Sequence, residues 1–257
     1  MIVIAIANQK GGVGKTTTAV TLASGFARRG RKTLLIDLDA QGHASLSLGV
    51  EKSEDLYRWL VQDKPLKQVV RSVKPGLDLI GSDRSTETVK RHIALLDFRE
   101  QLLEQRLEKC NYDLVVLDLA PSVDVLHTNG LAACDWVIIP TRLDALAIDG
   151  VNEILLKMGE LRQNGYDFDG YRLLPTFFER TTSETIAQFQ QLINTFGENV
   201  LPPIPQDTHV REAAAFGKTV WEYCPNSPAV QGYAKGKNKQ GGYAQLVERL
   251  LEVFDGR

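Results

Sequence analysis

A glycine-rich segment near the start of the chain combines the residue types that hold a phosphate chain. It reads Lys10-Gly11-Gly12-Val13-Gly14-Lys15-Thr16-Thr17. Glycines let the backbone wrap closely around an anion with its N–H groups pointing inward, and a helix that follows adds the positive end of its dipole. The Lys15 ammonium can reach the β and γ phosphates, and the Thr16 hydroxyl can ligate magnesium. The segment therefore predicts a site for a metal-bound nucleoside triphosphate.

Acidic residues end two apolar runs further along the chain. Asp37 and Asp39 follow the run 33–36, and Asp118 follows the run 114–117. The carboxyl ends of parallel strands meet at one edge of a sheet, where ligands bind. An aspartate at such an end suits a magnesium site, usually through water. Each aspartate taken alone could be a helix cap or a turn residue. The glycine-rich segment, Asp37 with Asp39, and Asp118 follow one another along βαβ units, and this order favours the phosphate site.

The elements that must position these groups are short apolar runs that alternate with helical periodicity, which is typical of βαβ units. The runs are apolar at nearly every position, as in parallel strands covered on both faces. Residues 17–29 and the set Phe98, Leu102, Leu103 and Leu107 have helical spacing. We predict an α/β fold with a doubly wound, mostly parallel sheet flanked by helices. We also predict that residues 1–257 form a single domain. The predicted strands are 2–7, 33–36, 77–80, 114–117, 136–140 and 171–175.

The composition limits the class of protein. Of the 257 residues, 43% are hydrophobic and 24% are charged, which excludes a disordered or collagen-like chain. Thirty Lys and Arg against 32 Asp and Glu leave a net charge of −2, so binding to nucleic acid requires a local basic patch. Three scattered cysteines and the lack of an apolar stretch of about 20 residues predict a cytoplasmic protein without integral membrane association.

The phosphate segment departs from the usual G-x-x-x-x-G-K-[ST] pattern, because Gln9 stands where the first glycine belongs. Lys10 beside two glycines gives K-G-G-x-G-K-T instead. With it the sequence resembles the ParA/MinD family of deviant Walker A P-loop ATPases, closest to ParA-type partition and positioning ATPases, which include carboxysome-positioning McdA-like members. Further similar segments are the D-x-D-x-Q-G stretch 37–42, the Walker B strand 112–118, and residues 120–122, 129–140, 204–205, 212–213 and 217–218.

The resemblance implies ATP and Mg²⁺ as cofactors and gives roles to individual residues. Lys15 and Thr16 would bind phosphate and magnesium, Asp39 would orient the attacking water beside the metal, and Asp118 would support the metal. Lys10 would reach across the interface of a homodimer that forms in the ATP state. Near the expected adenine site the family shows I-P-R-N-x-R, whereas this chain has Pro205, Gln206 and Asp207, followed by His209 and a displaced Arg211.

ParA-like members bind duplex DNA without sequence preference, and the resemblance implies the same here. A ParB-like or McdB-like adaptor would stimulate slow ATP hydrolysis, and the nucleoid-associated protein would position a plasmid, a chromosome or a protein organelle. Such binding needs basic side chains that face phosphates, although each of these residues could be an ordinary solvated charge. The candidates are Arg180, Arg211, Lys218, Lys235, Lys237 and Lys239, the last three in the acid-free segment 232–242.

Three other functions remain open from the sequence. A MinD-like membrane-associated ATPase would need a basic amphipathic C-terminal helix. In residues 246–257 Val247, Leu250, Leu251 and Phe254 share a face, but acidic side chains surround it, which favours packing into the core. The others are a small-molecule ATP-dependent ligase on the same fold and a nucleotide-gated binding module that barely hydrolyses ATP.

Overall fold

The computed structural model describes residues 1–235 and 238–256. Its centre is a seven-stranded sheet in the order β3-β4-β2-β5-β1-β6-β7. All neighbours in it are parallel except β3, which is antiparallel to β4. The predicted α/β fold with a doubly wound, mostly parallel sheet is confirmed. The strands are β1 (Ile2–Ile6), β2 (Thr33–Asp37), β3 (Arg71–Lys74), β4 (Leu77–Ile80), β5 (Leu114–Asp118), β6 (Trp136–Arg142) and β7 (Gly170–Thr176).

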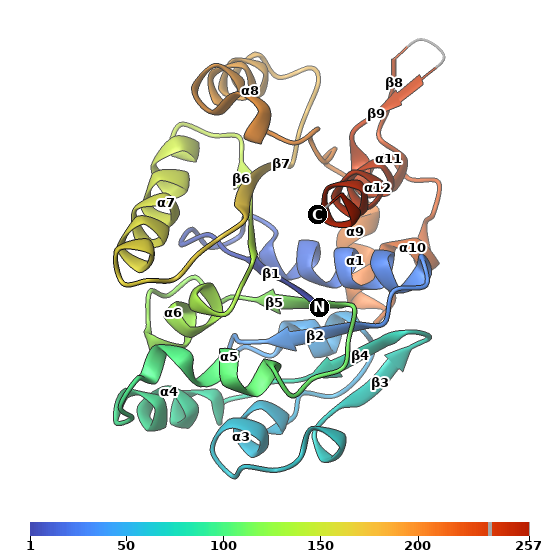
Figure 1. The fold of residues 1–257 in the computed structure, drawn as a ribbon. Coiled ribbons are helices and arrows are strands. Elements are labelled where there is room, and N and C mark those ends of the chain that lie inside the picture. The colour runs from blue at the N-terminus through green and yellow to red at the C-terminus, as the bar shows by residue number, and fades with distance from the viewer. Residues whose placement is uncertain (236–237, 257) are drawn as a thin grey trace.

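Helices cover both faces of this sheet (Figure 1). One layer contains α1 and α12, and the opposite layer contains α4, α5, α6 and α7 (Figure 1). The α-helices are α1 (Lys15–Arg28), α2 (His43–Ser47), α3 (Asp55–Leu60), α4 (Thr86–Ala94), α5 (Leu102–Leu107), α6 (Val125–Ala132), α7 (Ala147–Gln163), α8 (Ser183–Phe196), α9 (Thr208–Ala215), α10 (Val220–Tyr223), α11 (Pro228–Gln231) and α12 (Gly242–Asp255). Short 3₁₀ turns are η1 (Leu66–Gln68), η2 (Arg99–Gln101) and η3 (Gly197–Asn199).

The two helical layers bury alternate residues of the same strands. Ile4 and Ile6 of β1 pack in the cluster with α1 and α12, whereas Val3 and Ala5 pack in the cluster on the other face. Because every strand residue from Val3 to Ile6 is buried, the strand is apolar throughout, as the sequence predicts. This burial fixes the carboxyl ends of the strands, where Asp37 and Asp118 lie.

Helix α12 buries its apolar face against α1. Leu246, Val247, Leu250 and Phe254 are all buried in the cluster that contains Phe26 of α1. The prediction that this amphipathic segment packs into the core is therefore confirmed, and Leu251 at its margin is partly buried. An apolar face used in this way is not available to a lipid surface.

Two features differ from the sequence-based expectation or were missed by it. Phe98 was predicted to share a buried helical face with the leucines that follow. It is instead 78% exposed, with a left-handed φ of 51°, because a 3₁₀ turn separates it from α5. The short strand β3 was not predicted, since its sequence Arg-Ser-Val-Lys has no apolar run.

The basic segment after Gly232 forms a two-stranded antiparallel hairpin that extends from the body of the molecule (Figure 1). Its strands are β8 (Tyr233–Lys235) and β9 (Asn238–Gln240), so Lys235 and Lys239 each lie on a strand. Lys237 lies outside the described residues.

Two backbone segments meet without side chains between them. A Cβ atom on Gly49, after α2, would lie 2.6 Å from the Gly217 carbonyl oxygen. A Cβ atom on Gly217, after α9, would lie 2.5 Å from the Gly49 Cα. Both glycines have positive φ, at 75° and 62°. The close approach therefore requires glycine at both positions.

Candidate nucleotide site

The phosphate segment forms the turn between β1 and α1. Gly12 and Gly14 have φ values of 73° and 89°, which other residues rarely adopt. Gly14 is the N-cap of α1 and supplies no side-chain hydrogen bond to the first turn. The first N–H groups of α1 are thus left for an anion, and the helix dipole adds positive potential at the same point.

Polar contacts from neighbouring strand ends hold this turn in place. The Asn8 amide nitrogen donates to the Pro140 carbonyl oxygen at 2.8 Å, while the Asn8 side-chain oxygen accepts from the Lys10 N–H at 2.9 Å. The Thr176 hydroxyl donates to the Val13 carbonyl oxygen at 3.0 Å. Sequence reasoning missed Asn8 and Thr176, because their partners come from distant segments.

Lys15 begins α1 and points back into the turn. Its ammonium donates to the Lys10 carbonyl oxygen at 3.0 Å. Burial lowers the pKa of Lys15, and the carboxylates of Asp118 and Asp39 partly offset that effect. A buried ammonium with a backbone carbonyl as its hydrogen-bond acceptor is poised to exchange that partner for a phosphate oxygen.

The sheet places two of the predicted aspartates side by side. Asp37 and Asp118 are register partners at the carboxyl ends of β2 and β5, and both are buried. Asp37 has partners, because its carboxylate accepts from the N–H groups of Asp39 at 3.0 Å and Ala44 at 3.1 Å. Neither carboxylate oxygen of Asp118 makes a hydrogen bond of ordinary geometry among the described residues, although the Thr16 hydroxyl and the Lys15 ammonium lie near enough to act against the rise of its pKa. Burial and the negative charge of Asp37 raise the pKa of Asp118 well above its usual range.

A buried carboxylate without a partner fits a magnesium site. Mg²⁺ prefers oxygen ligands and keeps several waters while one or two protein groups and the substrate phosphates complete its shell. Among the residues that the structure describes, no group of three or more His, Cys, Asp or Glu side chains forms a metal cage of its own. The residues present therefore fit a metal held mainly by phosphate and water, with Thr16 and Asp118 on the protein side.

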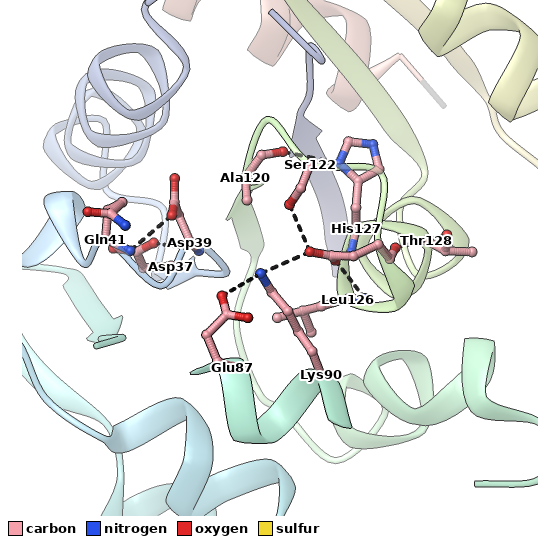
Figure 2. Close-up of polar contacts among 11 residues, drawn as sticks. Asp37, Asp39, Gln41, Glu87, Lys90, Ala120, Ser122, Leu126, His127 and Thr128 are labelled. Carbon is pink, nitrogen blue, oxygen red and sulfur yellow. Dashed lines mark hydrogen bonds and ion pairs between the residues drawn. The ribbon is translucent and has the colours of Figure 1, made fainter. Parts of the chain in front are cut away.

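Asp39 lies just beyond Asp37 and is only partly buried. Its carboxylate accepts from the Gln41 N–H at 2.9 Å, and its carbonyl oxygen accepts from the Ser82 hydroxyl at 2.5 Å. Figure 2 shows Asp37, Asp39 and Gln41 together on one side of the site. These contacts fix the backbone of Asp39 and the orientation of its carboxylate.

The loop after Asp118 is anchored by a second set of polar contacts, which Figure 2 draws around Lys90. The Lys90 ammonium lies 2.8 Å from Glu87 and 2.9 Å from Asp124. Asp124 is the N-cap of α6 and also accepts from the Ser122 hydroxyl at 2.7 Å. His127 Nδ1 lies 3.2 Å from the Ala120 carbonyl oxygen. The loop is thus held by both α4 and α6.

A cavity of about 310 Å³ lies beside the phosphate turn. Pro205, Gln206 and Asp207 line it, and their role as an adenine site stays a prediction. The Asp207 carboxylate, however, accepts from the N–H groups of His209 and Ala229, both at 3.0 Å, so it is engaged in capping α9. Other lining residues that the sequence analysis missed are Arg142, Thr176, Phe177 and Tyr243.

The predicted DNA-binding residues are not gathered at the phosphate turn. Arg180, Arg211 and Lys218 are all exposed. Arg211 lines the cavity just described, whereas the Arg180 guanidinium lies 5.3 Å from the ring centre of Tyr233 at the base of the β8–β9 hairpin. The structure brings Arg180 and the hairpin together and leaves Arg211 with the nucleotide site.

Comparisons with known proteins agree with this geometry. A family model described as an AAA domain matches residues 1–167. The chromosome-partitioning ATPase Soj of Thermus thermophilus is 39% identical over 238 residues, which cover 90% of this chain and 92% of that protein. The chain belongs to the ParA/Soj family of P-loop ATPases. The chromosome partitioning protein ParA of Caulobacter vibrioides is 33% identical and covers 91% of each chain.

Solved structures share the fold of this ParA/Soj family member. A plasmid partition protein from Borrelia burgdorferi bound to AMPPNP has a TM-score of 0.77 at 25% identity and covers 98% of both chains. A cobyrinic acid a,c-diamide synthase from Mycobacterium smegmatis with an ATP analogue and magnesium has a TM-score of 0.74 at 29% identity, covering 84% of this chain and 91% of that one. An ATP complex of a McdA variant from Cyanothece has a TM-score of 0.79 at 20% identity, covering 86% and 90%.

Among the helices described for residues 1–235 and 238–256, none combines the length and the apolar character that a bilayer crossing requires.

Proposed function

We propose that this ParA/Soj family member is an ATPase that dimerises with ATP, binds duplex DNA without sequence preference in that state, and positions a cargo with an adaptor protein. The observation that carries the proposal is the placement of buried Asp118, at the end of β5, close to Lys15 and Thr16 at the start of α1. This arrangement suits a metal-bound triphosphate, and the relatives that cover most of the chain include a chromosome-partitioning ATPase and a chromosome partitioning protein.

Residues 10–17 would hold ATP. The N–H groups of the turn and the Lys15 ammonium would bind the β and γ phosphates, and Thr16 and Asp118 would hold Mg²⁺ directly or through water. Bound Mg²⁺ would neutralise charge on the phosphate oxygens. Asp39 would accept a hydrogen bond from the attacking water and orient it toward the γ phosphate. Pro205, Gln206 and Asp207 would line the adenine pocket, mainly through their backbone.

Dimerisation would depend on Lys10. Its ammonium would pair with the nucleotide phosphates of a second copy, so that two ATP molecules lie between the two subunits. Each subunit would then satisfy charges that its partner cannot satisfy alone. Hydrolysis removes the γ phosphate and with it the support for the dimer.

DNA binding would use exposed basic side chains. The best candidates are exposed Arg180, which contacts Tyr233 at the hairpin base, and the hairpin strands that carry Lys235 and Lys239 in the sequence. Arg211 and Lys218 are further candidates, as is Lys237. A ParB-like or McdB-like adaptor would stimulate slow hydrolysis and release the cytoplasmic protein from the nucleoid. Residues 1–257 would act as a single ATPase domain.

The experiment that tests this proposal is binding to duplex DNA of arbitrary sequence with ATP, with ADP and without nucleotide across a salt series. We expect tight DNA binding with ATP alone. If the protein neutralises about six phosphates, raising the salt from about 50 to about 200 mM should weaken this binding about 1,000-fold. The absence of DNA binding in every state would overturn the proposal. Liposome binding and turnover with small-molecule phosphate acceptors would then test the membrane-associated and ligase alternatives.

The role of Asp39 is tested by Asp39→Ala. Because water orientation and not ATP affinity is lost, we expect ATP turnover to fall about 100-fold while ATP binding and ATP-dependent DNA binding persist. Nucleotide binding is measured by calorimetry and turnover by phosphate release. Normal turnover in this variant would refute the assigned role, and undetectable turnover in the parent chain would favour a nucleotide-gated binding module.

A further inference from the structure

Lys10 is already paired within its own chain. Its ammonium donates to both carboxylate oxygens of Asp144, at 2.7 and 2.6 Å. The two side chains are each 32% exposed, so the pair is neither fully solvated nor buried. Asp144 stands between β6 and α7, far from Lys10 in the sequence. The lysine proposed to act on a second copy therefore has a partner in the first.

Both ends of this pair are held by backbone contacts. The Asp144 carboxylate also accepts from the Leu146 N–H at 3.1 Å, and its carbonyl oxygen accepts from the Ala147 N–H at 3.0 Å. The Lys10 N–H is held by Asn8, whose side chain is bonded to Pro140 at the end of β6. The pair therefore joins two fixed backbone segments at one edge of the sheet, which lowers the entropic cost of forming it.

The surroundings of Lys10 are acidic and apolar. An open cavity at this point is lined by Lys10, Val123, Leu146, Asp149 and Glu153, among others. Val123 is 50% exposed and Leu146 is 58% exposed. The acidic side chains on α7 add to the negative potential that retains the ammonium in its own subunit. Binding to phosphates of a second copy must overcome that potential.

We infer that Asp144 is a positioning residue that stores the Lys10 ammonium in the monomer and competes for it with the nucleotide of a second copy. The inference rests on the proposed function, in which Lys10 acts across the dimer. On dimerisation Lys10 leaves Asp144, whose carboxylate keeps its hydrogen bond from the α7 N-terminus. Two Lys10–Asp144 pairs break when a symmetric dimer forms, so the fold-effect of one pair on the dimer dissociation constant is squared.

Asp144→Asn tests this competition. Asparagine keeps a side-chain oxygen that can accept from the Leu146 N–H, so the turn before α7 is retained while the negative charge is lost. A partly exposed pair corresponds to about a two- to five-fold effect, and two pairs give about a four- to 25-fold lower dimer dissociation constant with ATP and Mg²⁺. Sedimentation velocity would measure it in the full chain, in an Asp39→Ala background that is expected to slow hydrolysis.

Three matched variants separate this role from a general or structural effect. Asp149→Asn removes a neighbouring acid on α7 that does not pair with Lys10, and it should change the dissociation constant less than two-fold. Asp144→Glu can re-form the pair and should return the value toward the parent. In a Lys10→Ala background, where dimerisation is already weakened, Asp144→Asn should not restore it, because its effect passes through Lys10.

The outcomes distinguish this inference from the proposed function. A parent chain that stays monomeric with ATP overturns both. A parent chain that dimerises, depends on Lys10 and is unchanged or weakened by Asp144→Asn overturns the inference alone. An equal gain from Asp149→Asn also overturns it, because general electrostatics would then account for the effect.

Discussion

Two carboxylates six positions apart have opposite environments. Asp118, at the end of β5, is buried with neither oxygen hydrogen-bonded among the described residues, and burial together with Asp37 raises its pKa. Asp124, in the loop that follows, accepts from the N–H groups of Leu126 and His127 and pairs with Lys90. Burial alone would raise the pKa of Asp124, but these donors hold it below its ordinary value.

The difference distinguishes Asp118, a candidate ligand-binding carboxylate, from Asp124, a carboxylate that stabilises the fold. A buried carboxylate without partners costs stability, and such a residue is retained where a cation completes it. A carboxylate with several donors contributes stability and leaves no capacity for a metal. The same residue type therefore has a candidate catalytic role at 118 and an architectural role at 124.

The largest expected effect follows from Asp118→Asn. We expect ATP hydrolysis with Mg²⁺ to fall about 100-fold or more, because the carboxylate that would support the metal is lost. The free energy of unfolding of the nucleotide-free protein should not decrease, because burying a neutral amide costs less than burying a carboxylate and asparagine keeps a side-chain oxygen toward Thr16. Phosphate release and urea unfolding measure the two quantities. A clear loss of stability in this variant would erase the contrast with Asp124.

Asp124→Ala should give the opposite result. It removes the N-cap of α6 and leaves Lys90 with Glu87 alone, so the free energy of unfolding should fall by about 2 kcal/mol. Urea unfolding monitored by circular dichroism checks the value. Asp124→Asn is the control, because it keeps a capping oxygen and should lose less. A change below about 0.5 kcal/mol in Asp124→Ala would contradict the structural role.

The lowered pKa of Asp124 gives a test by pH. A carboxylate whose pKa is lower in the folded state stabilises the protein above its unfolded pKa of about 3.9, and this contribution is lost as the pH falls through the folded value. The difference in stability between the parent and Asp124→Asn should therefore be full at pH 6 to 7 and shrink below about pH 4. Unfolding of both proteins at matched pH provides the measurement. A constant difference would mean that charge at Asp124 is not involved.

Lys90→Met should have the smallest effect. The methionine retains most of the apolar stem, and Asp124 keeps the N–H donors of α6, so the loss should be about 0.5 to 1 kcal/mol. A double-mutant cycle with Asp124→Asn measures the coupling between the two side chains. Additive effects would show that the ion pair contributes nothing and that Asp124 acts through its capping contacts alone.

The fold and the phosphate turn could be predicted because their signals are local. Residues 10–17 are contiguous, and apolar runs that end in Asp37 and Asp118 reach one edge of a parallel sheet whatever the order of the strands. The functional roles given to these residues remain predictions. The proximity of Asp37 and Asp118 could be predicted from the sequence because the shared direction of parallel strands brings their carboxyl ends to one edge of the sheet.

The rest depends on contacts between distant segments. The cavity beside the turn is lined by Arg142 of β6, Phe177 just after β7 and Tyr243 of α12, and no periodicity in the sequence predicts that these residues lie together. The pair between Lys10 and Asp144 joins positions 134 residues apart. Phe98 was misplaced because helical spacing predicts a shared face but not the 3₁₀ turn that interrupts it. Such features require the tertiary arrangement.

The contact between Gly49 and Gly217 sets a rule for protein engineering. Gly217 follows α9, whose N-terminus lines the candidate adenine pocket, and Gly49 follows α2, which begins just after the Asp37 to Gly42 stretch. A library that varies the pocket through α9 must leave residue 217 as glycine, because even alanine there would strike the Gly49 backbone. Redesign of base specificity in this chain is thus bounded by a packing constraint outside the pocket itself.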